Sequence, residues 1–347
     1  MGAKDQLKVG DKLIGSEQPC FIIAEIGSNH DGSLDTALKH IEAAADCGAD
    51  AVKFQLFDAL GHTARKKLDD SGNLVDQPIF SFVENITLPE EWLPALKAES
   101  EKRGLAFLCS AFDVDKVNRL EELGVTAHKV ASGDLTHLPL LRYMAGKGKP
   151  VILSTGMAYL GEVAEAVEAL SPAREIPLVL LHCVSTYPSS YGDANLWAMV
   201  TLQKAFGFPV GLSDHSPGHT LPLGAIALGA SIIEKHVTFD RELTGPDHSY
   251  ALLFDEFERM VAEVRNLETA LGDGLKRPAE AEVPERLWAR RGLFAAVAIK
   301  KGEEITSEKI KIVRHAYGLH PRELEHVAGR TAKVDIPADG IINWDVV

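Results

Sequence analysis

The chain has 347 residues, of which 46% are hydrophobic and 25% charged, as in an ordinary globular protein. Its formal net charge of -14 argues against nucleic acid or an anionic membrane as partner, because both require a basic surface. No apolar run approaches the roughly 20 residues that span a bilayer, and the N-terminal segment lacks the apolar region of a signal peptide. We therefore expect a cytoplasmic protein, in which a few lysines in one cleft can still bind a small anion.

A repeated pattern of apolar strands and amphipathic helices follows a short predicted hairpin at residues 7–14. The predicted strands are residues 21–27, 51–57, 106–112, 127–133, 150–156, 178–184, 211–216 and 232–238. Apolar residues at helical spacing predict helices between them, at 33–47, 88–103, 114–123, 138–145, 160–170, 196–206, 221–228 and 254–271. This alternation of strands and helices is typical of a (β/α)8 TIM barrel.

The pattern divides the chain into two predicted domains. Residues 1–274 form the barrel with its N-terminal hairpin, and residues 275–284 have the composition of a linker. Short strands broken by Gly and Pro predict a small, mostly β domain at 285–347. The longest connection inside the barrel, residues 58–88, is predicted to overhang the C-terminal ends of the strands as a lid or substrate loop.

The four cysteines show no C-x-x-C spacing. They are Cys20, Cys47, Cys109 and Cys183, and three of them lie in apolar runs that read as strands. Such residues are more often reduced core cysteines than disulfides or zinc ligands.

Polar side chains gather near the C-terminal ends of the predicted strands. His215 and His236 end neighbouring strands, and the alternation of side chains puts Ser213 and Glu234 on the same face. The polar positions of the other strands are Glu25, Lys53, Gln55, Ser110, Lys129, Ser154 and Ser185. Active sites of barrels lie at this end, so the set predicts a catalytic site. A layer of satisfied polar residues in a wide barrel mouth is the alternative.

Two lysines and several serine hydroxyls describe a cradle for a phosphate and a carboxylate. Ser132 falls in the loop after its strand, where Gly133 allows the backbone to approach an anion. The cradle therefore predicts a small anionic substrate.

The two imidazoles are predicted to bind an exchangeable divalent cation such as Mn²⁺ or Mg²⁺. Hydrogen bonds from both rings to a substrate oxygen are the alternative. Glu25 and Glu234 are candidates for a general base or for positioning water, and a salt bridge to Lys53 or Lys129 is their structural alternative.

These residues stand in a set of motifs with a fixed order. The motifs are residues 25–32 (Glu-Ile-Gly-Ser-Asn-His-Asp-Gly), 52–55, 129–133, 152–157, 181–188, 211–215, 234–236 and 245–247. Together they resemble the bacterial sialic acid (N-acetylneuraminate) synthases, and residues 298–302 with Arg314 are similar to the antifreeze-like (SAF) domain of that family. The resemblance covers nearly the whole chain.

The resemblance implies a transferase that condenses phosphoenolpyruvate with an N-acetylated mannosamine-type sugar and releases phosphate by C–O cleavage. It implies that Lys53 contacts the carboxylate of phosphoenolpyruvate. The implied phosphate-binding residues are Ser110, Lys129, Ser132, Ser154, Ser185 and Ser213. His215 and His236 would bind Mn²⁺, with Mg²⁺ or Co²⁺ as alternatives, and Glu25 would accept a proton from water.

The resemblance also assigns the sugar end of the site. Gln55, Tyr187 and Asp247 match positions that contact the sugar. Arg314 matches a residue that enters the site from the partner subunit, because the C-terminal domains of this family are swapped in a homodimer and each caps the other barrel. The resemblance thus implies a homodimer.

Two departures from the family concern the sugar. The chain has Asp134 where the family usually has Glu, and the segment after Arg314 ends in Gly-Leu-His-Pro, closer to pseudaminic acid synthases. We expect an N-acetylneuraminate synthase that uses N-acetylmannosamine. A pseudaminic, legionaminic or Kdn type of synthase with a different amino sugar is the alternative.

Two other classes of function remain open from the residues alone. A Schiff-base aldolase would use Lys53 or Lys129 as a neutral nucleophile, although the serine-rich cradle argues against it. A non-catalytic protein would use residues 285–347 as a carbohydrate-binding or ice-binding module, although such a module needs no polar barrel mouth.

Overall fold

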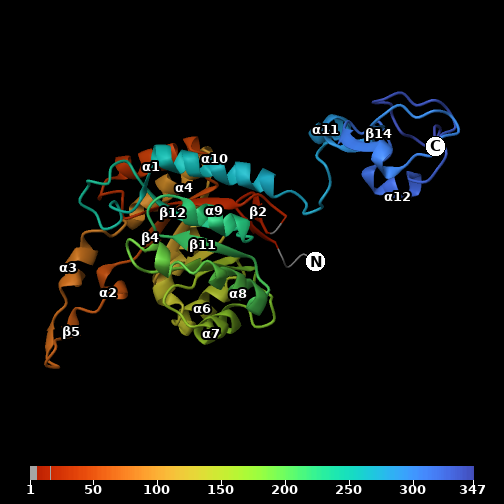
Figure 1. Ribbon diagram of the computed structural model, residues 1–347. Coiled ribbons are helices and arrows are strands. Elements are labelled where there is room, and N and C mark those ends of the chain that lie inside the picture. The colour runs from red at the N-terminus through yellow and green to blue at the C-terminus, as the bar shows by residue number, and fades with distance from the viewer. Residues whose placement is uncertain (1–5, 16) are drawn as a thin grey trace. The chain divides into compact units, whose positions relative to one another are not determined.

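The computed structural model describes residues 6–15 and 17–347 (Figure 1). The chain divides into two compact units, Met1–Gly272 and Asp273–Val347. Among the described residues, no helix combines the length and the apolar character that crossing a membrane requires.

A closed ring of parallel strands forms the centre of the first unit. In the described part of the chain its eight strands are β3 (Phe21–Gly27), β4 (Ala51–Leu56), β7 (Ala106–Ala111), β8 (His128–Val130), β9 (Val151–Ser154), β10 (Leu178–Cys183), β11 (Val210–Asp214) and β12 (Ile232–Thr238). Each strand pairs in parallel with the next one along the chain, and β12 pairs with β3 to close the ring. The predicted TIM barrel is confirmed.

Helices follow the strands as the periodicity predicts. They are α1 (Leu34–Asp46), α4 (Leu93–Lys102), α5 (Val114–Leu123), α6 (Leu138–Ala145), α7 (Leu160–Leu170), α8 (Trp197–Phe206), α9 (Thr220–Ala227) and α10 (Phe254–Leu271). The Asp113 side chain caps α5 by accepting a hydrogen bond from the Lys116 N–H at 2.8 Å, and Gly124 ends the helix in the left-handed region. A two-residue strand, β13 (Leu252–Leu253), adds to the end of β12 and leads into α10.

Side chains inside the barrel form two layers of opposite character. The lower layer is apolar and consists of Phe21, Ile23, Ala51, Ala106, Leu108, Ala127, Ile152, Val179, Leu181 and Ile232, packed with Leu7, Val9 and Ile14 of the hairpin. Two residues further along several strands, the same face carries the buried Glu25, Lys53, Ser110, Lys129, Ser154, Ser213 and Glu234. The period of two along each strand therefore puts a polar layer directly on an apolar one.

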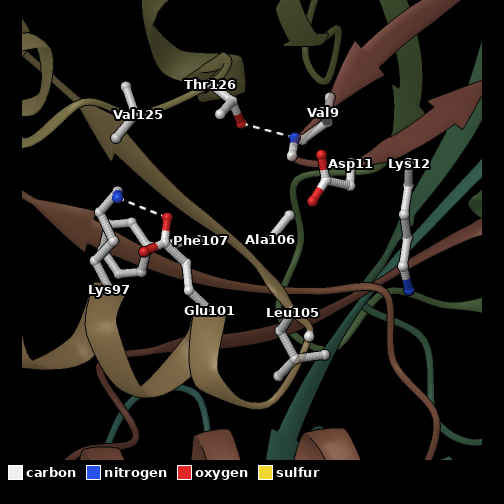
Figure 2. Close-up of a pocket in the computed structure, with 12 residues that line it drawn as sticks. Val9, Asp11, Lys12, Lys97, Glu101, Leu105, Ala106, Phe107, Val125 and Thr126 are labelled. Atoms are coloured by element: carbon white, nitrogen blue, oxygen red, sulfur yellow. Dashed lines mark hydrogen bonds and ion pairs between the residues drawn. The ribbon is translucent and has the colours of Figure 1, made fainter.

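The hairpin of β1 (Leu7–Val9) and β2 (Lys12–Ile14) covers the N-terminal end of the barrel. A cavity of about 250 Å³ lies between this hairpin, α4 and the start of β7 (Figure 2). Lys97 is paired with Glu101 at 2.6 Å, and the Gly10 N–H donates to Thr126 Oγ1 at 2.9 Å. Lys12 is paired with Asp50. Because these charges already have partners, this cavity is a poor candidate for a ligand site.

The connection predicted as a lid has secondary structure of its own. It contains α2 (Ala59–His62), β5 (Lys66–Leu68), β6 (Leu74–Asp76) and α3 (Pro78–Glu84), and it projects from the barrel in Figure 1. A small core of Phe57, Ala59, Phe80 and Val83 anchors it to the end of β4. We refer to residues 58–88 as the excursion.

The second unit has a small core around an antiparallel pair of strands. Its elements are α11 (Val283–Ala289), β14 (Arg291–Ala295), β15 (Ile310–Arg314) and α12 (Leu324–Val327). Isolated bridges such as Ile299 with Ile336 connect the remaining extended segments. Short 3-10 helices in both units are η1 (Glu90–Trp92), η2 (Ser132–Asp134), η3 (Tyr191–Asp193), η4 (Glu280–Glu282), η5 (Ser307–Lys309) and η6 (Pro321–Glu323).

The buried hairpin gives a test of the apolar layer. Val9→Ala removes two fully buried methyl groups and should lower the free energy of unfolding by about 1–3 kcal/mol. Lys8→Ala on the exposed side of the same strand is the matched control and should change it by less than about 0.5 kcal/mol. Urea denaturation of both variants measures the difference. Equal stability of the two would contradict the packing described.

Candidate active site

A cavity of about 290 Å³ opens at the C-terminal ends of the barrel strands. Of the sequence-predicted site residues, those lining it are Glu25, Lys53, Gln55, Ser110, Lys129, Ser132, Ser154, Ser185, Tyr187, Ser213, His215, Glu234 and His236. They come from every strand of the barrel or from the loop that follows it. The closed ring therefore brings together side chains that lie more than 200 residues apart in sequence.

Buried charges of alternating sign form the floor of the cavity. Lys53 Nζ lies 2.8 Å from Glu25 Oε2 and 3.6 Å from Glu234 Oε1. Lys129 Nζ lies 3.9 Å from Glu234 Oε2, and Gln55 donates a hydrogen bond of 2.7 Å to Glu25 Oε1. The salt bridges considered as a structural role for the two glutamates are thus present, and they also hold both carboxylates in the cavity.

The two carboxyl groups differ in acidity because their surroundings differ. Burial raises the pKa of Glu25, against the opposing effect of Lys53. Burial also acts to raise the pKa of Glu234, but Lys129 and Lys53 outweigh it and lower that pKa to about 2. Pairs of carboxyl groups whose pKa values are driven apart are typical of acid-base sites. Glu25 is therefore the better candidate for proton transfer, and Glu234 for a fixed negative charge.

A set of small donors surrounds the inner end of the cavity. Lys129 Nζ donates to Ser154 Oγ at 2.6 Å, and the Gly156 N–H donates to Ser132 Oγ at 3.0 Å. Ser110 Oγ is buried and has no hydrogen-bond partner among the described residues. Hydroxyls and an ammonium gathered around one space suit a phosphate or carboxylate.

Gly156 keeps this space open, and sequence reasoning did not single it out. A Cβ at this position would collide with Ser185 Oγ and lie 2.8 Å from Ser132 Oγ. Only a residue without a side chain lets both hydroxyls point into the cavity.

The rings of His215 and His236 lie together, with centroids 5.4 Å apart. His215 Nδ1 lies 3.0 Å from the Val184 carbonyl oxygen, so this nitrogen donates and Nε2 remains as an acceptor. Burial lowers the pKa of His236 to about 4, which keeps this ring neutral at pH 7. His236 Nδ1 is buried without a hydrogen-bond partner among the described residues.

The donor set fits an exchangeable divalent cation better than a closed zinc site. Neutral imidazoles bind metals through an unprotonated ring nitrogen, and both rings can supply one here. Within residues 6–15 and 17–347, no cluster of three or more His, Cys, Asp or Glu is arranged to hold a metal. A cation held by the two imidazoles would therefore complete its coordination with water or substrate.

Asp247 lies at the edge of a second cavity, of about 310 Å³, which shares Gln55, Tyr187 and His236 with the first. Asp247 Oδ2 accepts hydrogen bonds from the Ser28 N–H at 3.3 Å and hydroxyl at 3.1 Å, and it lies 3.8 Å from His236 Nδ1. The excursion supplies an apolar wall, consisting of Ile79, Phe82, Val83 and Ile86 together with Phe57.

Two predicted site residues lie outside both cavities. Asp134 lies in η2, where burial raises its pKa to about 6. The backbone winds into this short helix after Val130, so the strand predicted over 127–133 ends earlier than expected. Arg314 is an exposed residue of β15 in the second unit, and its approach to a partner's site remains a prediction.

Cys183 is buried and free, as predicted, and it also lines the first cavity. Its Sγ lies 3.7 Å from Ser185 Oγ and 3.9 Å from His215 Nδ1. All four cysteines lie in the described part of the chain and are free. The alternation on β10 could have identified Cys183, because Leu181 two residues earlier also points into the barrel.

His62 of the excursion lines both cavities, and the periodicity of the strands does not predict this position, because His62 lies outside the strands.

Comparison with known proteins gives the following relationships. Residues 40–276 match the NeuB family, and residues 290–347 match the SAF domain. N,N'-diacetyllegionaminic acid synthase from Legionella pneumophila is 37% identical over 99% of both chains. Pseudaminic acid synthase from Campylobacter jejuni is 38% identical over 92% of this chain and 94% of its own. The structure of N-acetylneuraminic acid synthetase from Leptospira borgpetersenii superposes with a TM-score of 0.73 at 38% identity, covering 81% of this chain and 94% of that one.

The small donors around Gly156 give a test of the anion cradle. Gly156→Ala places a methyl group where it displaces the hydroxyls of Ser132 and Ser185. The dissociation constant of inorganic phosphate should rise about tenfold or more, because charge-assisted hydrogen bonds contribute about 1.5–3 kcal/mol each. Titration calorimetry measures the affinity, and thermal unfolding checks that the fold is kept. Gly161→Ala, in α7 and outside both cavities, is the control because a Cβ there meets nothing within 4 Å; equal affinities in the two variants would contradict the assignment.

Proposed function

The chain belongs to the NeuB family, and we propose that its barrel mouth condenses phosphoenolpyruvate with an N-acetylated mannosamine-type sugar to give a nonulosonic acid and phosphate. One observation carries the proposal: a cradle of lysines and serines, a pair of imidazoles and two carboxyl groups line one cavity. The names of the relatives support the same class of reaction, because they are synthases of legionaminic, pseudaminic and neuraminic acids.

Phosphoenolpyruvate would bind in the cradle with its two anionic groups on the lysines. In the proposed pose, Lys53 contacts the carboxylate, while Lys129 and the serine hydroxyls contact the phosphate. Burial lowers the pKa of Lys129, and an anion beside this ammonium would favour its charged form.

We propose that His215 and His236 hold Mn²⁺, with Mg²⁺ and Co²⁺ as alternatives. When bound, such a cation supplies Lewis-acid polarisation of the sugar aldehyde. The chain's own contribution is orientation: the hydrogen bond from His215 Nδ1 to the Val184 carbonyl fixes one ring, and burial keeps His236 neutral.

The proposed reaction forms one carbon–carbon bond, and at C2 a carbon–oxygen bond from water replaces the carbon–oxygen bond to phosphate. C3 of phosphoenolpyruvate attacks the aldehyde carbon, and the positive charge that develops at C2 lies among the carboxylates of Glu25 and Glu234. The aldehyde oxygen takes up a proton and becomes a hydroxyl. Water then adds to C2, and Glu25 accepts its proton. The tetrahedral intermediate collapses to the C2 ketone as its hydroxyl loses a proton, and phosphate leaves with the oxygen and the electron pair of its C2–O bond. The raised pKa of Glu25 makes its carboxylate a stronger base toward this water.

The second cavity supports binding of the sugar. Gln55, Tyr187 and Asp247 offer polar groups, and the apolar wall from the excursion can contact an acetyl methyl group. No Lys or Arg belongs to the described residues that line this cavity, which favours an uncharged sugar over a sugar phosphate. N-acetylmannosamine satisfies these conditions.

A doubly acetamido-substituted sugar is the second candidate. The apolar wall has room for more than one methyl group, since it is built from five large side chains beside a cavity of about 310 Å³. Two relatives are named N,N'-diacetyllegionaminic acid synthases, at 37% and 39% identity.

We further propose a swapped homodimer in which the second unit of one chain closes the active site of the other. Its Arg314 would contact the sugar of the partner's site, since a planar guanidinium can bind an acetamido oxygen. A cap over the mouth would exclude bulk water from the developing cation at C2.

A panel of sugars tests the reaction. With phosphoenolpyruvate and Mn²⁺, N-acetylmannosamine should give the highest kcat/KM for phosphate release. Its 6-phosphate should react at least about tenfold more slowly, because no Lys or Arg belongs to the described residues that line the second cavity. A higher kcat/KM for a 6-deoxy diacetamido sugar would establish the second candidate. Phosphate release with no sugar in the panel would contradict the proposed condensation.

Metal removal tests the role of the imidazoles. EDTA should abolish turnover and Mn²⁺ should restore it, whereas His236→Ala should lose activity by about a hundredfold or more even with added Mn²⁺. The variant should keep its thermal unfolding midpoint, because the ring lies at the end of β12 rather than within the apolar layer. Turnover that resists EDTA, together with covalent trapping by borohydride on Lys53 or Lys129, would support the Schiff-base aldolase instead.

Mixed dimers test the swapped arrangement. Arg314→Ala and His236→Ala chains should each be nearly inactive alone. When they are refolded together, half of the dimers contain both chains and one of their two sites is intact, so activity should return to about a quarter of wild type. No gain on mixing would contradict a contribution of Arg314 across the dimer.

A further inference from the structure

A buried ion pair lies on the outer side of the barrel, directly behind the two imidazoles. Lys235 Nζ and Asp214 Oδ2 are 2.6 Å apart, and their side chains are only 1% and 2% exposed. Asp214 immediately precedes His215, and Lys235 immediately precedes His236. The two residues face each other across neighbouring strands, because Asp214 pairs with Lys235 in the register of β11 and β12.

The same two side chains also fix the backbone on the far side of His215. Asp214 accepts hydrogen bonds from the Ser216 N–H at 2.9 Å and from its hydroxyl at 3.1 Å. Lys235 Nζ also donates to the Ser216 carbonyl oxygen. The residues on both sides of His215 are therefore tied to the residue that precedes His236. We call Asp214, Ser216 and Lys235 the strand latch.

Stability alone gives a poor reason for charges at this position. The other outward-facing residues of these strands are apolar, among them Val210, Leu212, Ile233 and Val237, and they pack against the helices. Replacing a buried ion pair by apolar residues of similar volume is often neutral or stabilising. The ion pair can instead fix the position of the two strand ends, because its directed hydrogen bonds favour one separation and one orientation of β11 and β12.

We propose that Asp214 and Lys235 are positioning residues that set the separation and orientation of the two imidazoles for cation binding. The inference rests on the proposed function, in which His215 and His236 hold the metal. Neither Asp214 nor Lys235 lines the cavity, so these two residues act through the backbone of the histidines and not by contact with substrate or cation.

Lys235→Met and Asp214→Asn test the latch in the full-length protein. The dissociation constant of Mn²⁺, measured from the electron paramagnetic resonance signal of free Mn²⁺, should rise about tenfold to a hundredfold in Lys235→Met. Phosphoenolpyruvate binding without metal should change by less than about twofold, because the cradle lies mainly on other strands. Lys235→Arg keeps the charge and should recover part of the Mn²⁺ affinity.

Arg265→Met is the matched control at the opposite end of the barrel. Arg265 also joins segments of the barrel through charge, since it contacts Asp50 at 3.0 Å and the Cys20 carbonyl at 2.8 Å. This variant should lose stability and keep its Mn²⁺ affinity. A purely structural role for the latch predicts the same result for Lys235→Met, and that result would overturn the proposal.

Two further outcomes separate the latch from the proposed function. If Lys235→Met does not fold, Asp214→Asn retains the shape of the side chain and carries the test. If the wild-type protein binds no Mn²⁺, the metal assignment fails. Crystal structures of the wild type and the variant then test the latch by the separation and orientation of the two imidazole rings. Imidazole rings still 5.4 Å apart and equally oriented in the variant would overturn it.

Discussion

Four buried charges that alternate in sign hold the mouth of this barrel together. Glu25, Lys53, Glu234 and Lys129 come from four strands, and each lies within 4 Å of a neighbour of opposite charge. A charge buried here without a counterion would destabilise the protein by several kcal/mol. The alternation allows a closed ring of strands to carry buried ionised groups at its polar layer, and those groups are the ones the proposed chemistry uses. Stability of the mouth and reactivity of the site therefore depend on the same contacts.

Much of this arrangement could be predicted from periodicity. A period of two along the strands and of 3.6 along the helices located the barrel and most of the residues that line its main cavity. Side-chain type alone did not place Cys183 in the site: the cysteine is buried and free as predicted, but its position on β10 also faces the cavity. Gly156 carries no functional group that a sequence pattern could identify. Its role is to leave space for the hydroxyls of Ser132 and Ser185. The alternation of side chains on β12 points Lys235 away from the interior, but it gives no sign that the side chain of Asp214 packs against Lys235 in a buried ion pair.

Longer-range features had no local signal at all. The sequence of the excursion is rich in Asp, Lys and Gly and predicts only a loop. In the structure the segment contains α2, β5, β6 and α3, and Phe80 and Val83 of α3 pack with Phe57. His62 reaches the cavity only because this segment folds back toward β4. Residues such as Asp134, whose backbone winds into η2, depend on a local change of conformation that alternation cannot reveal.

The N-terminal hairpin determines from which end of the barrel a small molecule can enter and leave. The apolar layer of the barrel is packed against Leu7, Val9 and Ile14 of the hairpin, so the barrel is closed at its N-terminal end. Whatever enters the mouth must leave by the same opening. A molecule at the inner end of the cavity can then leave only after a molecule bound nearer the mouth has left, so the order of departure is the reverse of the order of arrival.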